Sequence, residues 1–196
     1  MIKVGFKKIS DEAKLPMKAH ATDSGFDLFV SEDVSIKPGE TKVIKTGIAI
    51  KMPPGYEAQV RPRSGITSKT DLRVQLGTID NDYTGEIGII VDNISGNQSN
   101  NASYVYRDIK GDFIDASNIC EGTYYEVKKG DKLAQLVIAP IPGVEVYEFD
   151  DDYEAVRGSN GFGSTDESEE SILGSINRSF NEVVRNSKVI KEDYIS

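Results

Sequence analysis

The sequence predicts an all-β domain of the jelly-roll or distorted β-barrel kind, and three observations support this prediction. Short runs rich in β-branched and aromatic residues recur along the chain, with Gly, Pro, Asn or Asp between them. Lys37-Pro38-Gly39-Glu40 and Met52-Pro53-Pro54-Gly55 are typical turn sequences. No long helical pattern interrupts these runs. Many short strands without long helices favour a sandwich or a jelly roll.

The expected strands follow one another in chain order. Each is a short run of β-prone residues that ends at a turn-forming residue or a polar segment. We expect strands near Lys3–Lys7, Gly25–Val30, Val34–Ile36, Lys42–Met52, Tyr56–Arg61, Arg73–Leu76, Ile87–Asp92, Tyr104–Ile109, Tyr124–Val127, Leu133–Ala139 and Val144–Phe149.

A chain of 196 residues suits one domain with appendages, and we assign residues 1–149 to the β core. Within it, residues from about 97 to 121 are rich in Asn, Ser and Asp and are expected to form an inserted segment or long loop. Residues 150–169 are rich in Gly, Ser and acidic residues and suggest a flexible arm. Residues 170–196 predict a C-terminal amphipathic helix, because apolar residues between Ile172 and Val184 recur at three- and four-residue spacing. This helix would dock on the body or, alternatively, bind a partner.

The composition excludes several classes of protein. The mean hydropathy is −0.38 and no apolar run approaches the length of a membrane span, so no membrane association is expected. Most of the net charge of −9 lies between Val146 and Glu170, and the near-neutral body has no long basic block that could hold polymeric nucleic acid. Cys120 is the only cysteine, and the N-terminus does not resemble a signal peptide. We therefore expect a cytoplasmic protein.

The segment from Gly77 to Glu86 contains a carboxylate, a turn, a tyrosine and another carboxylate between two β-rich runs, Leu72–Leu76 and Ile87–Val91. A strand, a short polar turn and a second strand predict a hairpin. Its exposed backbone N–H and C=O groups could read a small planar ligand. The alternative is an ordinary hairpin with polar turn residues.

Two segments suit phosphate binding. Arg61–Ser68 follows a strand and would open a short helix, with Ser64 facing a phosphate at its start; the alternative is a surface turn with a solvated arginine. Arg157–Thr165 contains three glycines whose N–H groups can point at an anion. Arg157 would add a bidentate phosphate donor, and Phe162 could close over a planar base. A simple Gly/Ser linker is the alternative for this segment.

Two polar side chains are expected inside apolar strands. Asp27 must find a partner there, either a Mg²⁺-bound water or a structural hydrogen bond to a neighbouring turn. Gln135 lies in the run Leu133–Val137 and needs its amide satisfied. It would bind a phosphate or a catalytic water, or make a hydrogen bond in the core.

In chain order, these five segments resemble the five motifs of the trimeric dUTPases, from about Ala21 to Thr165. The chain is similar to the phage or bacterial forms that carry an inserted segment. The resemblance implies a jelly-roll subunit with a mobile C-terminal arm, and a homotrimer with three active sites between subunits. It also implies Mg²⁺-dependent hydrolysis of dUTP to dUMP and pyrophosphate, which keeps uracil out of DNA and supplies dUMP.

The resemblance further implies a role for each matched residue. Asp80 would be the general base for the water that attacks the α-phosphorus. Tyr83 would pack under the deoxyribose and exclude a 2′-hydroxyl, and Asp27 would reach the Mg²⁺ through water. The remaining substrate-binding residues would be Gly77 and Ile79 at the uracil edge, Arg63, Ser64, Gly65 and Gln135 near the phosphates, and Arg157, Phe162, Gly163, Ser164 and Thr165 in the arm, with Phe162 stacking on uracil.

The chain also departs from the family pattern. The usual Asn-x-Pro-Gly before the third motif is here Gln75-Leu76-Gly77, and Asp166 follows the arm where Gly is usual. The segment between the third and fourth motifs is longer than usual, and the chain continues beyond the usual C-terminus.

Two other functions stay open. One is a dCTP deaminase, or a bifunctional form, on the same fold. The other is a regulator that binds a partner protein through residues of about 97–121, because long polar insertions are often binding loops. A tolerated surface loop is the alternative for the insertion. Its candidate anchors are the aromatic residues Tyr104, Tyr106, Phe113, Tyr124 and Tyr125.

Overall fold

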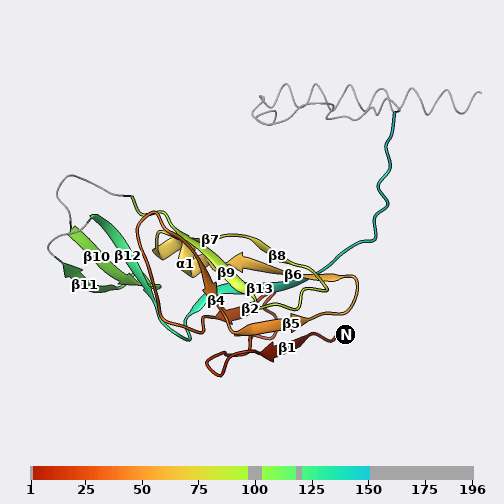
Figure 1. Ribbon diagram of the computed structural model, residues 1–196, viewed down its shortest axis with the longest axis horizontal. Coiled ribbons are helices and arrows are strands. Elements are labelled where there is room, and N and C mark those ends of the chain that lie inside the picture. Colours follow the sequence, from red (N-terminus) through yellow and green to blue (C-terminus); the bar gives the residue numbers. More distant parts are fainter. Residues whose placement is uncertain (1, 97–102, 118–120, 151–196) are drawn as a thin grey trace, which may run out of the picture. The chain divides into compact units, whose positions relative to one another are not determined.

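The computed structural model describes residues 2–96, 103–117 and 121–150, and these residues form an almost entirely β structure (Figure 1). Met1–Val144 make up one compact unit and Glu145–Ser196 a second. Residues 145–150, the described part of the second unit, have no regular secondary structure. The predicted all-β class is confirmed.

The first unit contains the strands and the single short helix of the described residues. In chain order they are β1 (Gly5–Lys8), β2 (Phe26–Phe29), β3 (Val34–Ile36), β4 (Thr41–Lys45), β5 (Ile48–Lys51), β6 (Tyr56–Pro62), α1 (Ser64–Lys69), β7 (Leu72–Val74), β8 (Gly77–Ile79), β9 (Gly88–Asn93), β10 (Ser103–Asp108), β11 (Phe113–Ser117), β12 (Glu121–Val127) and β13 (Lys132–Pro140).

The strands form four sheets. Their orders are β2-β13-β6-β8, β4-β9-β7, β11-β10-β12-β3 and β1-β5. Neighbouring strands are antiparallel in every described pair except β10 and β12. Figure 1 shows β10, β11 and β12 gathered at one end of the unit, away from β1 and β5.

The core forms where alternate side chains of these strands point inward. In β9, Ile89, Val91 and Asn93 are buried, whereas Ile90 between them is exposed. The buried Asn93 amide donates hydrogen bonds to the carbonyls of Ile36 (3.0 Å) and Thr123 (2.7 Å), and it thereby ties β9 to β3 and β12. The largest fully buried side chains include Tyr125, Leu28, Ile36, Ile44, Ile48, Leu72, Ile87, Ile89, Leu133 and Leu136.

The prediction of one strand over Lys42–Met52 is wrong, because the chain turns at Thr46 and Gly47 and forms β4 and β5 instead. Gly47 has a φ of 66°, which favours glycine. Its N–H donates to Glu86 Oε1 (2.7 Å), and Thr46 Oγ1 donates to the carbonyl of Ile87 (2.6 Å). These tertiary contacts hold the break in place.

The predicted hairpin is correct in its pairing but not in its connection. β7 and β9 are antiparallel neighbours, with Leu72 opposite Asn93 and Val74 opposite Val91. Between them, however, the chain leaves this sheet and forms β8, which pairs with β6 in the other sheet. The segment Gly77–Glu86 therefore bridges two sheets.

The predicted insertion contains more regular structure than expected. β10, β11 and the beginning of β12 lie within residues 97–121, where the sequence suggests only a short strand. β12 pairs with β3, so the insertion continues a sheet of the body. The strand predicted at Val144–Phe149 is absent, because these residues have no ladder partner. The arm beyond Asp150 and the predicted helix at 170–196 lie outside the described residues.

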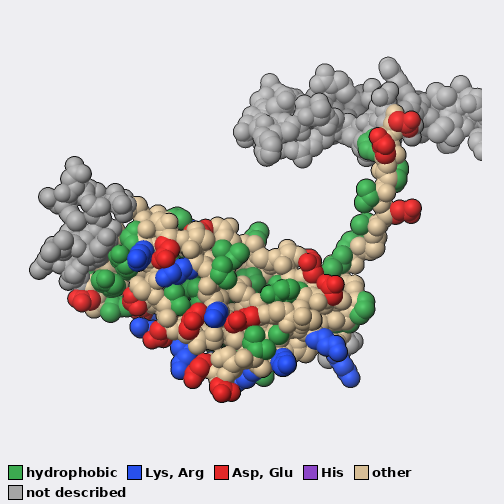
Figure 2. Space-filling model, in the orientation of Figure 1, with side chains coloured by type: hydrophobic (Ala, Val, Ile, Leu, Met, Phe, Trp, Pro, Cys, Tyr) green, Lys and Arg blue, Asp and Glu red, His purple; other side chains and the backbone are tan. Residues whose placement is uncertain are grey.

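Within the described part of the chain, no helix is long and apolar enough to span a bilayer. On the face of the first unit seen in Figure 2, basic and acidic side chains are interspersed. This face offers no continuous basic stripe of the kind that holds a nucleic-acid backbone.

Candidate functional site

The first candidate pocket lies where β2, α1 and β13 meet, and it collects residues from three of the segments that the sequence singles out. Its volume is about 340 Å³ and its lining is mainly polar. β2 contributes Asp27, the start of α1 contributes Arg63, Ser64 and Gly65, and β13 contributes Gln135. Residues that are far apart in the sequence thus share one polar pocket.

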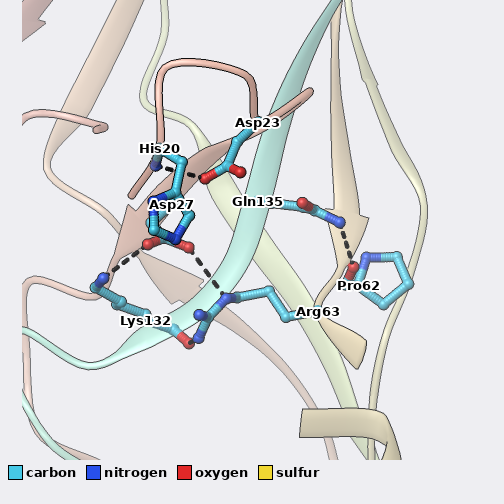
Figure 3. Close-up of polar contacts among 7 residues, drawn as sticks. All are labelled: His20, Asp23, Asp27, Pro62, Arg63, Lys132 and Gln135. Carbon is cyan, nitrogen blue, oxygen red and sulfur yellow. Dashed lines mark hydrogen bonds and ion pairs between the residues drawn. The ribbon is translucent and has the colours of Figure 1, made fainter. Parts of the chain in front are cut away.

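The Asp27 carboxylate lies between two cations at this pocket (Figure 3). Arg63 Nε is 3.1 Å from Oδ1, and Lys132 Nζ is 2.8 Å from Oδ2. The Asp27 side chain is only 13% exposed, and these ion pairs compensate its charge, while Oδ2 accepts no hydrogen bond from the described residues. Arg63 also donates to the carbonyl of Lys132 (2.7 Å), which fixes the guanidinium. Two cations thus face one carboxylate and can attract an anion, although Asp23, which also lines the pocket, balances their excess charge.

Gln135 lies directly opposite Asp27 in the pairing of β13 with β2. Its Nε2 donates to the carbonyl of Pro62 at 2.9 Å, so a hydrogen bond within the protein, one of the two alternatives from the sequence, is present (Figure 3). Its Oε1 accepts no hydrogen bond from the described residues. The amide is therefore held at one end and can accept from a water or ligand at the other.

The short helix predicted after Arg61 is present as α1. It begins after Arg63, whose extended backbone (φ −99°, ψ 132°) marks the N-cap, and it buries Ile66 against the body. Thr70 ends it by donating from both its N–H (3.0 Å) and its Oγ1 (2.7 Å) to the carbonyl of Ile66. In the first turn the Ile66 N–H donates to the carbonyl of Arg63 (3.1 Å), whereas the N–H groups of Ser64 and Gly65 have no partner within the helix. Both residues line the pocket, and an unpaired backbone N–H suits a phosphate oxygen.

A second candidate pocket, of about 210 Å³, brings together Gly77, Ile79, Asp80 and Tyr83. Asp80 is exposed at the end of β8, and its carbonyl accepts the Tyr83 N–H (3.2 Å) in a turn. The Tyr83 hydroxyl donates to the carbonyl of Glu86 (3.0 Å), so the ring folds back over its own turn. A carboxylate, an aromatic ring and strand backbone therefore surround one small pocket.

Two side chains hold this turn in place. Asn81 Nδ2 donates to the carbonyl of Pro53 (2.6 Å), and Glu86 Oε1 accepts the Gly47 N–H (2.7 Å). The sequence presents Glu86 as a second carboxylate near the ligand, but in the structure it has this structural partner. Asn81 was not singled out from the sequence, because its partners come from a distant loop.

The two pockets are separate on one chain. Asp80 does not line the first pocket, and Asp27 does not line the second. A third pocket, of about 460 Å³, shares Gln135 with the first and Gly77 with the second. The groups predicted to act on one ligand are therefore distributed over neighbouring surfaces of the chain.

Lys132 is the main site residue that sequence reasoning missed. In a regular strand, residues three apart point to opposite faces, so Lys132 and Gln135 would not share a pocket. The pairing of β13 with β2 shifts register between Lys132 and Ala134, and this irregularity brings both side chains to the first pocket. Asp23 and Ser24, which precede β2, also line this pocket and were not predicted.

The fifth predicted segment cannot be placed relative to either pocket. Arg157, Phe162, Gly163, Ser164 and Thr165 lie outside the described residues.

The first pocket fits a Mg²⁺ ion that is held mainly by a ligand. No group of three or more His, Cys, Asp or Glu side chains among the described residues could hold a metal by itself. Mg²⁺ commonly keeps several waters and takes one or two carboxylates together with substrate phosphates. Asp23 and Asp27 are the carboxylates at the first pocket, and that of Asp27 is already paired with Arg63 and Lys132.

Comparison of the sequence with known proteins gives consistent matches. A model of the dUTPase family matches residues 11–100. The deoxyuridine 5′-triphosphate nucleotidohydrolase of Gloeothece citriformis is 40% identical over 166 residues, which are 84% of this chain and 97% of that protein.

Comparison of the fold with solved structures points the same way. The dUTPase of Staphylococcus bacteriophage 80alpha with dUpNHpp, described among phage dUTPases that control transfer of virulence genes, has a TM-score of 0.76 at 35% identity. The match covers 83% of this chain and 97% of that one. A mutant dUTPase from phage phi11 of S. aureus, described with a structural Mg(II) ion, has a TM-score of 0.71 at 37% identity and covers 78% and 99%.

Proposed function

Since this chain belongs to the dUTPase family of dUTP diphosphatases, we propose that it hydrolyses dUTP to dUMP and pyrophosphate in a Mg²⁺-dependent reaction in the cytoplasm. The observation that carries the proposed mechanism is the first pocket. There Asp27, Arg63, Ser64 and Gln135 converge from three segments on a polar surface that also holds the cation of Lys132. Such a surface suits the triphosphate of a nucleotide.

In the proposed mechanism, the first pocket binds the phosphate chain. Arg63 and the N–H groups of Ser64 and Gly65 contact phosphate oxygens, and Lys132 adds a second cation. Mg²⁺, when bound, neutralises the phosphates, and Asp27 and Asp23 are the side chains that would hold its waters. The ligand phosphates then compete with Asp27 for Arg63 and Lys132.

The second pocket supplies base recognition and the attacking water. The backbone from Gly77 to Ile79 reads the uracil edge, and Tyr83 excludes a 2′-hydroxyl by sterics. Asp80 takes the proton of a water whose oxygen forms a bond to the α-phosphorus. The bond from that phosphorus to the bridging oxygen breaks, and pyrophosphate leaves with the electron pair. Gln135 orients the water or a phosphate through its Oε1.

We further propose that the enzyme is a homotrimer whose active sites lie between subunits, and that the arm from Arg157 to Thr165 closes over the nucleotide. The separation of Asp27 and Asp80 into two pockets supports this arrangement, because a neighbouring copy can bring a second pocket to the first. Light scattering on the full chain measures the molecular mass. A monomer that is fully active would overturn the shared sites.

The direct test of the activity is pyrophosphate release from dUTP beside dTTP, dCTP and UTP, with and without Mg²⁺. Fast release from dUTP alone, only with Mg²⁺, is the expected result. Ammonia or deoxyuridine products from dCTP would instead indicate the related deaminase. No release from any nucleotide would refute hydrolysis.

A second candidate function is regulation through a partner protein bound at the insertion. The observation that favours it is an exposed apolar pair on β11, where Phe113 is 61% and Ile114 is 50% exposed. Tyr106 and Tyr124 add an aromatic pair with ring centroids 5.1 Å apart. Tyr125 is not an anchor, because it is buried and its hydroxyl contacts Asp71.

The regulatory role is tested with Phe113→Ser and Ile114→Ser combined. A matched control replaces Ile9 and Leu15, which are 48% and 50% exposed elsewhere on the unit. The first variant should lose capture of a host or phage protein while it keeps dUTP turnover, and the control should keep both. Equal capture by both variants would exclude this surface as the interface.

A further inference from the structure

A fourth pocket adjoins the first, because the two share lining residues. Its volume is about 370 Å³, and Arg63, Gly65 and Lys132 line both pockets. Two further lysines line only the fourth pocket: Lys69 from the last turn of α1 and Lys110 from the turn between β10 and β11. Four cations therefore surround one cavity.

The charges in this pocket are poorly balanced. Asp131 is the only acidic residue that lines it, and its Oδ2 accepts the Lys128 N–H (2.8 Å). Arg63 and Lys132 already share Asp27, whereas the ammonium groups of Lys69 and Lys110 make no ion pair or hydrogen bond with any described residue. A chain with a net charge of −9 thus concentrates unpaired positive charge here. Such a cavity attracts a compact multivalent anion.

The pocket depends on a close approach between the insertion and α1. Gly111 has a φ of 83°, and a Cβ there would lie 2.5 Å from the carbonyl oxygen of Lys69. Asp108 Oδ1 accepts the N–H groups of Lys110 and Asp112, each at 2.8 Å, and so shapes the turn. The insertion is therefore built to place Lys110 beside Lys69.

Two buried apolar side chains form part of the pocket wall. Ile66 on α1 is 4% exposed and Ile109 in the turn is 7% exposed, and both line the cavity. The segments that carry the cations are thus already packed against the body. A bound anion would therefore not pay the entropic cost of ordering a loose loop.

We propose that this pocket is a second polyphosphate site, and that it receives pyrophosphate from the neighbouring phosphate-binding pocket. Arg63 and Lys132 line both cavities, so a pyrophosphate can pass to Lys69 and Lys110 without losing all of its cationic partners. The choice of pyrophosphate rests on the proposed dUTP hydrolysis, which generates it. The diphosphate end of another nucleotide has the same chemistry and can reach the same cations.

The test is calorimetric titration of pyrophosphate into the full chain, already saturated with dUpNHpp and with excess Mg²⁺ in both solutions. The analogue fills the first site, so the heat reports the second. Lys69→Gln combined with Lys110→Gln should weaken pyrophosphate binding by about tenfold. Lys7→Gln combined with Lys51→Gln removes the same charge elsewhere and should leave it unchanged. A parallel titration with dTTP shows whether the site binds only free pyrophosphate or also the phosphate end of a nucleotide.

Loss of pyrophosphate binding in the first pair alone supports the site, and a parallel loss for dTTP extends it to nucleotide tails. If the Lys69/Lys110 and the Lys7/Lys51 double variants weakened pyrophosphate binding equally, the effect would reflect only the overall charge, and the proposal would be overturned. Absence of pyrophosphate binding to the saturated wild type, or binding of dTTP alone, would also overturn it. If the wild type bound pyrophosphate here but did not hydrolyse dUTP, the proposed function would fail while the site stood.

Discussion

Gly25 lies against Gln135 with no room for a side chain: a Cβ on Gly25 would be 2.7 Å from Oε1 and 3.2 Å from the Cβ of Gln135. The Oε1 atom is the end of the amide that is free to meet a ligand, so the glycine keeps the first pocket open. We predict that Gly25→Ala displaces Gln135 and costs about 1–3 kcal/mol of stability. dUTP turnover should fall as well. Thermal unfolding and kinetics measure both effects, with Gly143→Ala as the control because its surroundings are open.

Asp27→Asn should destabilise the protein, because it leaves Arg63 and Lys132 facing each other without their shared carboxylate. We expect a loss of about 2 kcal/mol, limited by solvent around the cations. The apparent affinity for Mg²⁺ in dUTP turnover should also decrease. Asp33→Asn is the control, since its pair with Lys128 is 3.6 Å long and exposed. Equal stability of the two variants in urea would contradict a special role for the Asp27 pair.

Asp80→Asn should lower kcat by about 10²–10⁴-fold, because an amide cannot accept the proton of the attacking water. Binding of dUpNHpp, measured by calorimetry, should stay close to that of the wild type. Asp82→Asn changes the same charge in the same exposed turn and should leave kcat unchanged. Substantial turnover by the Asp80 variant would remove this residue from the base role.

Phe162→Ala should raise KM for dUTP and slow the reaction, because the proposed stacking on uracil is lost. Steady-state kinetics measure this effect. Phe149→Ala is the control, because Phe149 is exposed but precedes the arm, and its kinetics should match the wild type. Unchanged kinetics in the Phe162 variant would mean that this ring does not stack on the substrate.

The pKa of Tyr125 is raised above its ordinary value, chiefly because the phenol is buried. Folding therefore favours the neutral hydroxyl. This contribution to stability is fully present below a pH of about 10 and is lost as pH rises through the folded-state pKa. Tyr125→Phe should be less stable by about 1 kcal/mol at neutral pH, because the Asp71 N–H loses its acceptor. Its stability should fall less steeply than that of the wild type at high pH.

Urea unfolding at about pH 8 and about pH 11 measures this difference. Tyr147→Phe is the control, because Tyr147 is 78% exposed. Parallel losses in the wild type and in Tyr125→Phe would rule out this tyrosine as the source of the pH dependence.

Much of the fold follows from local sequence patterns. Runs such as Val34–Ile36 and Leu133–Ala139 have β-prone residues and clear turn boundaries, and strands are present there. Asp27, Ser64 and Gln135 could be singled out because polar groups within or just after apolar strands need partners. The strands β8 and β11 were not predicted, because a three-residue strand and a polar insertion carry little periodicity.

The sequence by itself determined the all-β class, the order of the five segments and thereby the family, since these depend on residue types and on their order along the chain. Only the tertiary structure decided which side chains meet. The register shift in β13 brings Lys132 beside Asp27, the passage of β8 into another sheet separates Asp80 from Asp27, and Gly111 brings Lys110 to Lys69. Each of these relationships involves residues distant in the chain, and it is decided by pairing register and packing rather than by local propensity.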